Sequence, residues 1–369
     1  MAGATIGYVG VDHHHRDPYF RIAEELDLTI AAICEPGVDI ERRDLRPLQE
    51  RPDEITASSG DIPDIVRDAV IYRDPKRLIE SETLDAIWIT YANDRTPEIV
   101  EHAVDNGVHV LSEKPIARTA TDLKPIVNRA DSKGIAITPT FFYRANPIVR
   151  DLREMAEANR FGQIWSLDGR FIGSQLVYRN TDHYIYDRER SRGGVLQWIG
   201  LHWLDMMMYV IDEPFTRVCA SIQPAEVTDV EAGATLQFET GSGIIGTFQS
   251  GYYLDDRTKD THLGIYGTDL QARSTVHHGP LVHSPTTTLE LISGNSSWEP
   301  ARKRNTEYTF SYERFPEWGD SVLLFFDAFF SGIETGTMLA NGHDAVRILE
   351  LLDATYTSAE QNEWVDVGD

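Results

Sequence analysis

The chain has 369 residues, which is enough for about two domains of ordinary size. Its 41% hydrophobic content indicates a folded protein, and its formal charge of −25 argues against nucleic acid and membrane surfaces as partners, because binding to either depends on Lys and Arg. The two cysteines, Cys34 and Cys219, cannot form a disulfide framework. No charged leader opens the sequence and no apolar run is long enough to cross a bilayer, so we predict a soluble cytoplasmic protein.

The basic residues are divided unevenly, with 28 Arg and 6 Lys against 59 Asp and Glu. An acid-rich, lysine-poor surface is expected of a protein that works in concentrated salt, where the Debye length shortens to about 3 Å and self-repulsion is screened. We therefore predict a halophilic source. Transfer from molar KCl to low salt is expected to lower the melting temperature in thermal unfolding, and equal melting temperatures in both would contradict this prediction.

The first part of the chain alternates short apolar runs with amphipathic stretches, the pattern of βα units on a parallel sheet. Strands are predicted at residues 5–9, 28–34, 84–90, 108–111 and 135–139. Helices are predicted at residues 18–26, 97–106 and 120–133, the last two ending at Gly107 and Gly134. The charged stretch 37–64 is predicted to be an irregular excursion. Together these elements define an N-terminal α/β domain over residues 1–143.

Strand-like runs dominate the second part of the chain, residues 144–369. Strands are predicted at residues 164–171, 216–222, 232–238, 244–253 and 261–266, and helices at residues 148–158, 195–210, 321–333 and 343–358. Several of the strands alternate polar and apolar residues, as an antiparallel sheet with one open face should. The patch near residues 284–297 is predicted to be a loop. An α+β domain with a mainly antiparallel sheet follows.

A glycine turn at Gly10 follows the first strand. A strand, a glycine turn and a helix form the place where a dinucleotide pyrophosphate binds to a helix N-terminus. Counting from Gly10, however, Asp12 and His15 replace the second and third glycines of the GxGxxG motif. Two interpretations of this turn remain open: a modified nucleotide-binding site and a purely structural turn. The run His13 to His15 could also indicate metal, but neighbours in sequence are expected to point in different directions, so no metal site is predicted.

Two further candidates stand at strand ends. Glu35 ends the second strand, where an acid accepts hydrogen bonds from the ribose hydroxyls of NAD and disfavours the 2′-phosphate of NADP. Lys114 follows the strand at 108–111 and is predicted to lie in the crevice at the carboxyl ends of the strands. There it can hold an alcohol oxygen and stabilise negative charge on it. A solvent-facing Glu35 and an exposed loop lysine are the alternative interpretations.

The predicted helix at 195–210 carries the fourth candidate, His202. Two glycines precede this helix and allow close backbone approach, and Trp198 and Asp205 lie on faces adjacent to His202. An imidazole has a pKa suited to taking a proton from an alcohol near neutral pH. A satisfied core histidine is the competing interpretation.

These motifs give the chain a resemblance to a known family. The degenerate glycine turn, the strand ending at Thr90, Glu113-Lys114-Pro115, the Gly-Gly…Gly-x-His-x-x-Asp segment and the closing stretch 344–365 resemble the Gfo/Idh/MocA oxidoreductases. The resemblance covers nearly the whole chain. It implies an N-terminal Rossmann domain that binds NAD(P), a C-terminal α+β domain with an open antiparallel sheet, and an active site between them. It also implies pairing of subunits through that sheet, so a homodimer or homotetramer is expected.

By motif match, Lys114 is similar to the family's catalytic lysine and His202 to its catalytic histidine. The cofactor-binding residues that we predict are Gly10, Asp12, His13, Glu35, Thr90, Glu113 and Lys114. The predicted substrate-binding residues are Tyr178, Trp198 and Asp205. The match breaks at Trp198, where many family dehydrogenases have Asp, and at Tyr91, where Pro is usual. His202 therefore lacks the usual acidic partner unless Asp205 or another carboxylate replaces it.

Aromatic and arginine side chains are concentrated between residues 178 and 203. Aromatic rings can cover the apolar face of a sugar, and arginine can bind a carboxylate or phosphate, so the substrate is predicted to be a carbohydrate, including acidic ones. We predict an NAD-dependent dehydrogenase that transfers a hydride between a sugar, polyol or sugar-acid hydroxyl and nicotinamide. One alternative is a non-catalytic ligand-binding or regulatory member of the fold. Another is an enzyme with tightly bound NAD that uses transient oxidation.

Overall fold

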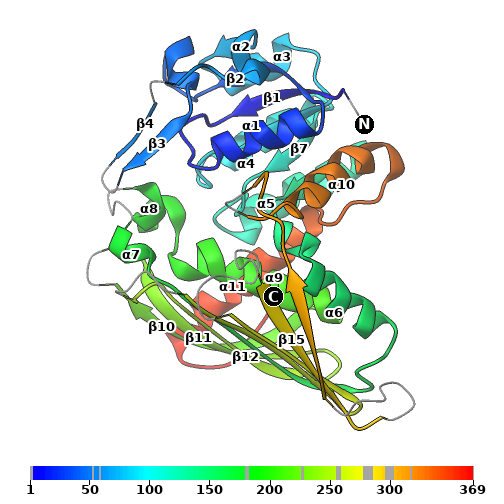
Figure 1. The fold of residues 1–369 in the computed structure, drawn as a ribbon. Coiled ribbons are helices and arrows are strands. Elements are labelled where there is room, and N and C mark those ends of the chain that lie inside the picture. Colours follow the sequence, from blue (N-terminus) through cyan, green and yellow to red (C-terminus); the bar gives the residue numbers. More distant parts are fainter. Residues whose placement is uncertain are drawn as a thin grey trace. The chain divides into compact units, whose positions relative to one another are not determined.

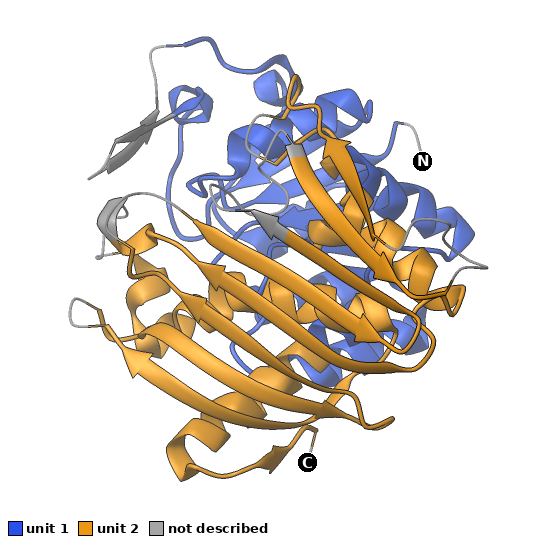
Figure 2. Cartoon of the chain, turned by 60° about the horizontal axis from the view of Figure 1, so that its bottom comes forward, with its two compact units in different colours: residues 1–140, 323–346 blue, residues 141–322, 347–369 orange. Residues whose placement is uncertain are grey.

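The structure is a computed structural model that describes residues 3–51, 54–57, 60–178, 183–225, 228–254, 259–276, 286–295, 303–315 and 318–368; for residues 49–51, 54–57, 177, 178, 275, 276 and 286 it describes the backbone alone. The chain forms two compact units (Figure 2). Unit 1 comprises residues 1–140 and 323–346, and unit 2 comprises residues 141–322 and 347–369. The sequence analysis placed a single boundary after residue 143. The structure divides the chain differently, because residues 323–346 belong to unit 1.

Unit 1 is built on a six-stranded sheet in the order β5-β2-β1-β6-β7-β8. Its strands are β1 (Thr5–Val9), β2 (Thr29–Cys34), β5 (Val70–Tyr72), β6 (Ala86–Ile89), β7 (His109–Ser112) and β8 (Ile137–Pro139). All its pairings are parallel, which confirms the predicted Rossmann-like α/β domain. The strand order reverses between β1 and β6. The carboxyl ends of these two strands therefore form the switch point at which open α/β sheets bind ligands.

The helical elements of unit 1 are α1 (Arg16–Glu25), η1 (Arg42–Leu45), α2 (Asp64–Arg67), α3 (Pro75–Ser81), α4 (Thr96–Asp105), α5 (Ala120–Lys133) and α10 (Val322–Thr335), whose first residue belongs to unit 2. Helix α5 has the predicted bounds because Thr119 caps its first turn and Gly134, at φ 69°, ends it. Phe326 of α10 stacks on Trp88 of β6 with ring centroids 4.9 Å apart. This contact explains why the late segment belongs to unit 1.

The excursion at 37–64 and the region after it contain elements that the sequence analysis did not assign. A two-stranded hairpin joins β3 (Leu48–Arg51) to β4 (Glu54–Ala57). Strand β5 and helix α3 follow it. Strand β5 has three residues at the edge of the sheet, and its Val70 is 46% exposed. Its apolar run, residues 69–72, is short and was not assigned to a strand.

Unit 2 is built on a nine-stranded sheet in the order β16-β15-β14-β13-β9-β12-β11-β10-β17. Its strands are β9 (Ile164–Ile172), β10 (Phe215–Pro224), β11 (Glu231–Thr240), β12 (Ile245–Gly251), β13 (Asp260–Gly267), β14 (Leu270–Val276), β15 (Thr286–Ser293), β16 (Lys303–Thr309) and β17 (Val365–Asp366). Its pairings are antiparallel except the parallel one between β9 and β12. The mainly antiparallel α+β domain is confirmed. The loop predicted at 284–297 is wrong, because β15 lies there and buries Leu289 and Leu291 at alternate positions.

Helices cover one face of this sheet (Figure 1). The helical elements of unit 2 are η2 (Phe142–Ala145), α6 (Pro147–Glu157), α7 (Gln175–Tyr178), η3 (Tyr184–Tyr186), α8 (Arg188–Ser191), η4 (Leu196–Gly200), α9 (Leu201–Ile211) and α11 (Gly342–Gln361), which begins in unit 1. Helix α9 packs directly on β9, since a Cβ at Gly169 would lie 2.7 Å from the Met207 sulfur. None of the helices in the described part of the chain is long and apolar enough to span a membrane.

Candidate active site

Three neighbouring strands of unit 1 end in predicted site residues. Gly10 follows β1, Thr90 follows β6, and Glu113 and Lys114 follow β7. Gly10 has φ 94°, and a Cβ on it would overlap the Thr90 carbonyl group, so glycine is required there. The Thr90 hydroxyl donates to the Gly10 carbonyl at 2.6 Å. The first glycine of the turn thus keeps the close approach expected of a dinucleotide turn.

Glu35 lies at the end of β2 and is 5% exposed. One of its carboxylate oxygens accepts the backbone N–H of Asp12 at 3.2 Å, which ties the end of β2 to the glycine turn. Burial, reinforced by the Asp12 carboxylate, raises the pKa of Glu35 to about 7. A tight glycine turn and a buried acid at the end of the second strand fit the diphosphate and ribose of a dinucleotide. The Asp12 side chain itself is exposed.

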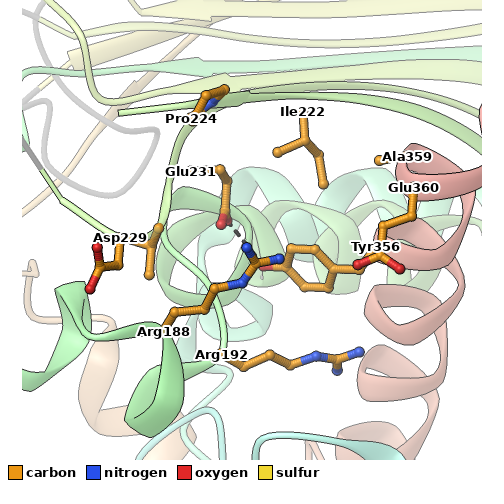
Figure 3. A pocket seen from close by; sticks show the side chains of 10 residues that line it. Arg188, Arg192, Ile222, Pro224, Asp229, Glu231, Tyr356, Ala359 and Glu360 are labelled. Carbon is orange, nitrogen blue, oxygen red and sulfur yellow. Dashed lines mark hydrogen bonds between the residues drawn. The ribbon is translucent and has the colours of Figure 1, made fainter. Parts of the chain in front are cut away.

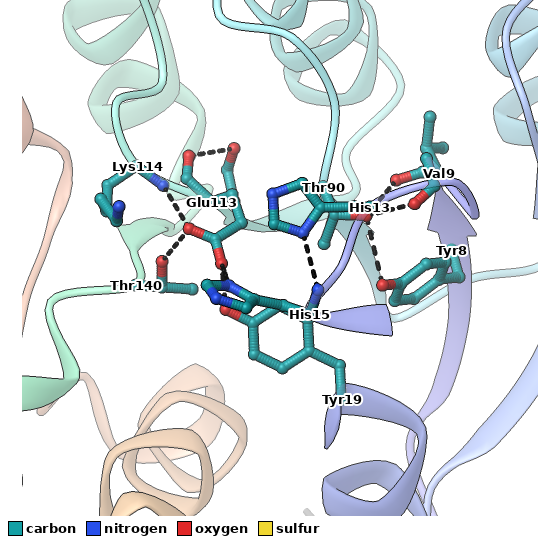
Figure 4. A network of polar contacts seen from close by, with 11 residues as sticks. Tyr8, Val9, His13, His15, Tyr19, Thr90, Glu113, Lys114 and Thr140 are labelled. Atoms are coloured by element: carbon teal, nitrogen blue, oxygen red, sulfur yellow. Dashed lines mark hydrogen bonds and ion pairs between the residues drawn. The ribbon is translucent and has the colours of Figure 1, made fainter. Parts of the chain in front are cut away.

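Glu113 is the centre of a buried polar network in unit 1 (Figure 4). Its Oε1 accepts from the Tyr19 hydroxyl and lies 2.6 Å from His15 Nδ1, while its Oε2 accepts from the Thr140 hydroxyl and the Lys114 amide, each at 3.0 Å. Burial alone would raise the pKa of Glu113, but His15 and Lys114 hold it well below its usual range. Glu113 therefore fixes the backbone at Lys114 and orients His15.

The side chains of His13, His14 and His15, the histidine cluster, gather at the start of α1. Their ring centroids lie 4.0 to 4.9 Å apart, and their potential ligand atoms lie within 4.8 Å of one another. The expectation that these neighbours point in different directions is therefore wrong. The helical backbone at His15 and the bond from its amide to His13 Nδ1, at 3.1 Å, bring the rings together.

In unit 2, His202 lies in the first turn of α9 and is 2% exposed. Its ring stacks on Tyr143, with centroids 4.7 Å apart and planes inclined by 13°, and Phe142 lies at 5.4 Å. A π-helical turn, η4, leads directly into α9. Such turns occur frequently at functional sites. Stacking and burial together restrict the His202 ring to one orientation.

Asp205, one turn after His202, is held by an arginine. Its two carboxylate oxygens accept from Arg144 Nε at 3.0 Å and from a terminal nitrogen of Arg144 at 2.5 Å. The two side chains are 3% and 7% exposed. The guanidinium also lies over the ring of Tyr209, 4.8 Å from its centroid. Asp205 is thus one half of a buried ion pair in unit 2, and its contact with a substrate stays a prediction.

The glycines before α9 serve packing within unit 2. A Cβ on Gly194 would overlap the Glu231 carbonyl, and one on Gly193 would overlap the Tyr356 hydroxyl. The Glu231 carboxylate accepts from the amides of Gly194 at 2.7 Å and Leu196 at 3.0 Å, and from the Tyr356 hydroxyl at 3.0 Å. Glu231 and Tyr356 line a pocket of about 190 Å³ (Figure 3). These bonds anchor the start of η4, the turn that leads into α9 and His202.

Trp198, a predicted substrate-binding residue, contacts this anchor. The Trp198 indole N–H donates to the carbonyls of Ile185 and Gly193, at 3.2 and 3.1 Å, and its ring packs against a small apolar cluster. A packed indole therefore occupies position 198, at which the sequence analysis noted the absence of the usual acid. Tyr178 ends α7, but its side chain lies outside the described residues.

Sequence reasoning missed several residues that surround the predicted site residues within each unit. They are Tyr19, Thr140, Tyr143, Arg144, Glu231 and Tyr356. One had a usable signal, since Tyr19 lies four residues after His15 on the same helix face. The others meet their partners only through the tertiary fold.

Comparisons with known proteins agree with this architecture. A model described as "Oxidoreductase family, NAD-binding Rossmann fold" matches residues 53–141, and a model of the "GFO/IDH/MocA C-terminal domain" matches residues 149–273. The chain is therefore an oxidoreductase with an NAD-binding Rossmann domain. It belongs to the Gfo/Idh/MocA family.

Among its relatives, D-xylose 1-dehydrogenase (NADP(+)) 2 of Haloferax volcanii is 24% identical over 90% of this chain and 94% of its own. Levoglucosan dehydrogenase of Pseudarthrobacter phenanthrenivorans is 22% identical over 80% and 83%. A solved structure of a levoglucosan dehydrogenase, in complex with NADH and levoglucosan, superimposes with a TM-score of 0.80 at 18% identity, covering all of both chains. That similarity shows the shared fold.

Proposed function

We propose that this chain is an NAD-dependent dehydrogenase that acts on a hydroxyl group of a sugar, polyol or sugar acid. One observation supports the proposal most directly: the glycine turn, Thr90 and Lys114 stand at the ends of three adjacent strands in one unit. An ammonium group beside a dinucleotide turn is well placed to act next to a bound cofactor. The relatives named for activity on xylose and levoglucosan support a carbohydrate substrate.

In the proposed reaction, the two candidate catalytic residues act on the same alcohol group of the substrate. His202 accepts the hydroxyl proton, and its stacking on Tyr143 keeps the ring aligned for that transfer. Lys114 stabilises the negative charge that develops on the oxygen, while Glu113 holds the backbone from which it extends. NAD, when bound, supplies the hydride acceptor. Gly10, Thr90 and Glu35 are proposed to hold the dinucleotide, together with His13 and the turn at Asp12.

This function is tested by titrating the protein with NAD and NADP in molar KCl and then following nicotinamide absorbance with a panel of aldoses, polyols and sugar acids. Binding of NAD followed by its reduction with at least one of these substrates is expected. Binding without reduction by any of them would favour a ligand-binding protein. Product formation without net reduction of the cofactor would instead favour transient oxidation by tightly bound NAD.

Preference for NAD over NADP is expected to weaken as the pH falls through about 7, where Glu35 titrates. Above this pH the Glu35 carboxylate is ionised and repels a 2′-phosphate, and below it the neutral carboxyl group repels it less. Dissociation constants for both cofactors, measured by fluorescence titration on either side of this pH, check the prediction. The phosphate of NADP titrates as well, so Glu35→Gln is the control. If the ratio of the NADP and NAD dissociation constants changes with pH in Glu35→Gln as much as in the unchanged protein, Glu35 does not cause that change.

We also propose that copies of the chain pair through the open face of the unit 2 sheet. Exposed, uncharged side chains occupy this face along β11 and β12, at Thr235, Gln237, Thr247 and Gln249. Acidic side chains on the same face are paired, Glu239 with Arg217 and Asp168 with His262, which reduces the repulsion that two copies of a chain with a net charge of −25 would meet. A homodimer or homotetramer in high salt is expected by light scattering.

Two free cysteines are compatible with a cytoplasmic location.

A further inference from the structure

The histidine cluster at the start of α1 is a feature of unit 1 that the proposed reaction does not explain. We infer that His13, His14 and His15 bind one divalent metal ion of the kind that prefers imidazole nitrogen, such as Zn²⁺. This metal site goes beyond the proposed function and does not depend on it. The sequence analysis predicted no metal because neighbouring side chains were expected to diverge, whereas the three rings in the structure lie together.

The rings are close enough to share one ion. One potential ligand atom from each histidine lies within 4.8 Å of the other two. In a tetrahedral zinc site with Zn–N bonds of about 2.0–2.1 Å, the ligand nitrogens are about 3.4 Å apart. All three residues are half-buried, so rotation about their side-chain bonds can bring the rings closer and an ion can reach them from solvent. Three nitrogens leave the fourth position of such an ion to water.

His15 already has the second partner that metal-binding histidines usually have. Its Nδ1 lies 2.6 Å from Oε1 of Glu113 (Figure 4). The carboxylate of Glu113 also accepts from the hydroxyls of Tyr19 and Thr140 and from the Lys114 amide, so it accepts the Nδ1 proton of His15 as well. The lone pair of the neutral ring is then on Nε2. A carboxylate that holds the other nitrogen in this way fixes the tautomer and direction of a metal-binding imidazole.

The other two rings are expected to contribute unequally. The centroid of the His14 ring lies 4.0 Å from that of His15 and 4.4 Å from that of His13. His13 Nδ1 accepts the His15 amide at 3.1 Å, so its lone pair is engaged in a hydrogen bond. Binding of an ion by His13 therefore replaces this bond, which offsets part of the gain. His14 and His15 are the stronger ligands of the proposed site, and His13 is the weaker one.

The charges around the turn favour a cation. Asp12, Glu35 and Glu113 place three carboxyl groups near it, and each attracts a cation when ionised. Lys114 offsets part of the charge of Glu113. Arg16, although next in sequence to the cluster, is fully buried, and its guanidinium donates to three backbone carbonyls. A divalent ion bound by neutral imidazoles therefore has nearby carboxylates to balance its charge.

Calorimetric titration with Zn²⁺ in molar KCl tests this site on the full chain, prepared without a histidine affinity tag. Cofactor is left out, because His13 is also proposed to hold the dinucleotide. One Zn²⁺ per chain is expected to bind. The dissociation constant is expected to rise about 100-fold in His14→Gln and in His15→Gln, and about tenfold in His13→Gln. The matched control is His343→Gln, which changes an exposed histidine of unit 1 paired with Asp131 and is expected to bind Zn²⁺ as the unchanged protein does.

A thermal measurement accompanies the titration. Zn²⁺ is expected to raise the melting temperature of the unchanged protein, because a ligand that binds the folded state stabilises it, and to have no such effect on His14→Gln. This variant leaves the bonds of Glu113 intact, so it remains informative if His15→Gln is unstable without metal.

Three results would overturn the metal site. The first is the absence of stoichiometric Zn²⁺ binding by the unchanged protein. The second is binding that is unchanged in both His14→Gln and His15→Gln, which would place the ion elsewhere on this acid-rich chain. The third is an equal loss of affinity in His343→Gln. Reduction of NAD is not part of this test, so failure of the metal site and failure of the proposed function are distinguishable.

Discussion

The variants Lys114→Ala and His202→Ala are each expected to lose about two to three orders of magnitude in kcat while still binding NAD. Removal of one group that stabilises charge in the transition state has an effect of about this size, and so does loss of a positioned general base. Lys114 is the side chain that can stabilise an alkoxide at the end of β7, and His202 is the group proposed to take its proton. Turnover by stopped-flow or steady-state assay, with NAD affinity by calorimetry, checks both effects.

The matched control is Lys76→Ala, which removes an exposed lysine of α3 and is expected to leave turnover unchanged. For His202, the replacement His202→Gln distinguishes chemistry from packing, because it keeps a polar side chain of similar size. Turnover should remain low in this variant, because glutamine cannot accept the proton. Near-normal turnover in Lys114→Ala or His202→Ala would remove that residue from the mechanism.

Breaking the buried pair of Arg144 and Asp205 is expected to destabilise the protein by about 3 to 5 kcal/mol. Both partners are almost fully buried and form two hydrogen bonds, so Asp205→Asn or Arg144→Met leaves a buried group without its charged partner. Because Asp205 lies one turn after His202 on α9, turnover should fall as well. Chemical denaturation in high salt measures the free energy of unfolding.

The double variant Arg144→Met, Asp205→Leu tests the cause of this loss. Replacing both charges with apolar side chains removes the unpaired charge, so much of the lost stability is expected to return. A double variant as unstable as the sum of the single ones would mean that the two side chains act independently. Arg217→Met is the surface control, since its ion pairs with Glu239 and Asp366 are exposed and are expected to contribute little.

The sequence was most informative where local rules decide the structure. Strand β1 and helix α5 were predicted with their observed bounds, because a short apolar run marks the first and an amphipathic stretch that ends at Gly134 marks the second. Glu35 and Lys114 were found by their position after strands, a rule that follows from the topology of open parallel sheets. Local pattern and fold class therefore led to the candidate residues of unit 1.

The residues that hold the site in place depend on contacts between distant parts of the chain. Arg144 and Asp205 are 61 residues apart, and Tyr356 and Glu231 are 125 apart. No periodicity or motif predicts such partners, because they meet only after the sheet and helices have packed. Strand β15 was missed for a related reason. Its two inward leucines stand among Ser and Thr, and the neighbouring strands β14 and β16 complete its pairing.

The return of α10 to the N-terminal unit has a consequence for biosynthesis. Trp88 and Tyr19 lie against Phe326, at 4.9 and 5.5 Å between ring centroids, and that phenylalanine is translated after unit 2 is almost complete. The first 140 residues therefore leave the ribosome with an aromatic surface that stays uncovered until nearly the whole polypeptide has been made. Nascent chains stalled before α10 should engage chaperones at this surface, and release should follow once α10 emerges.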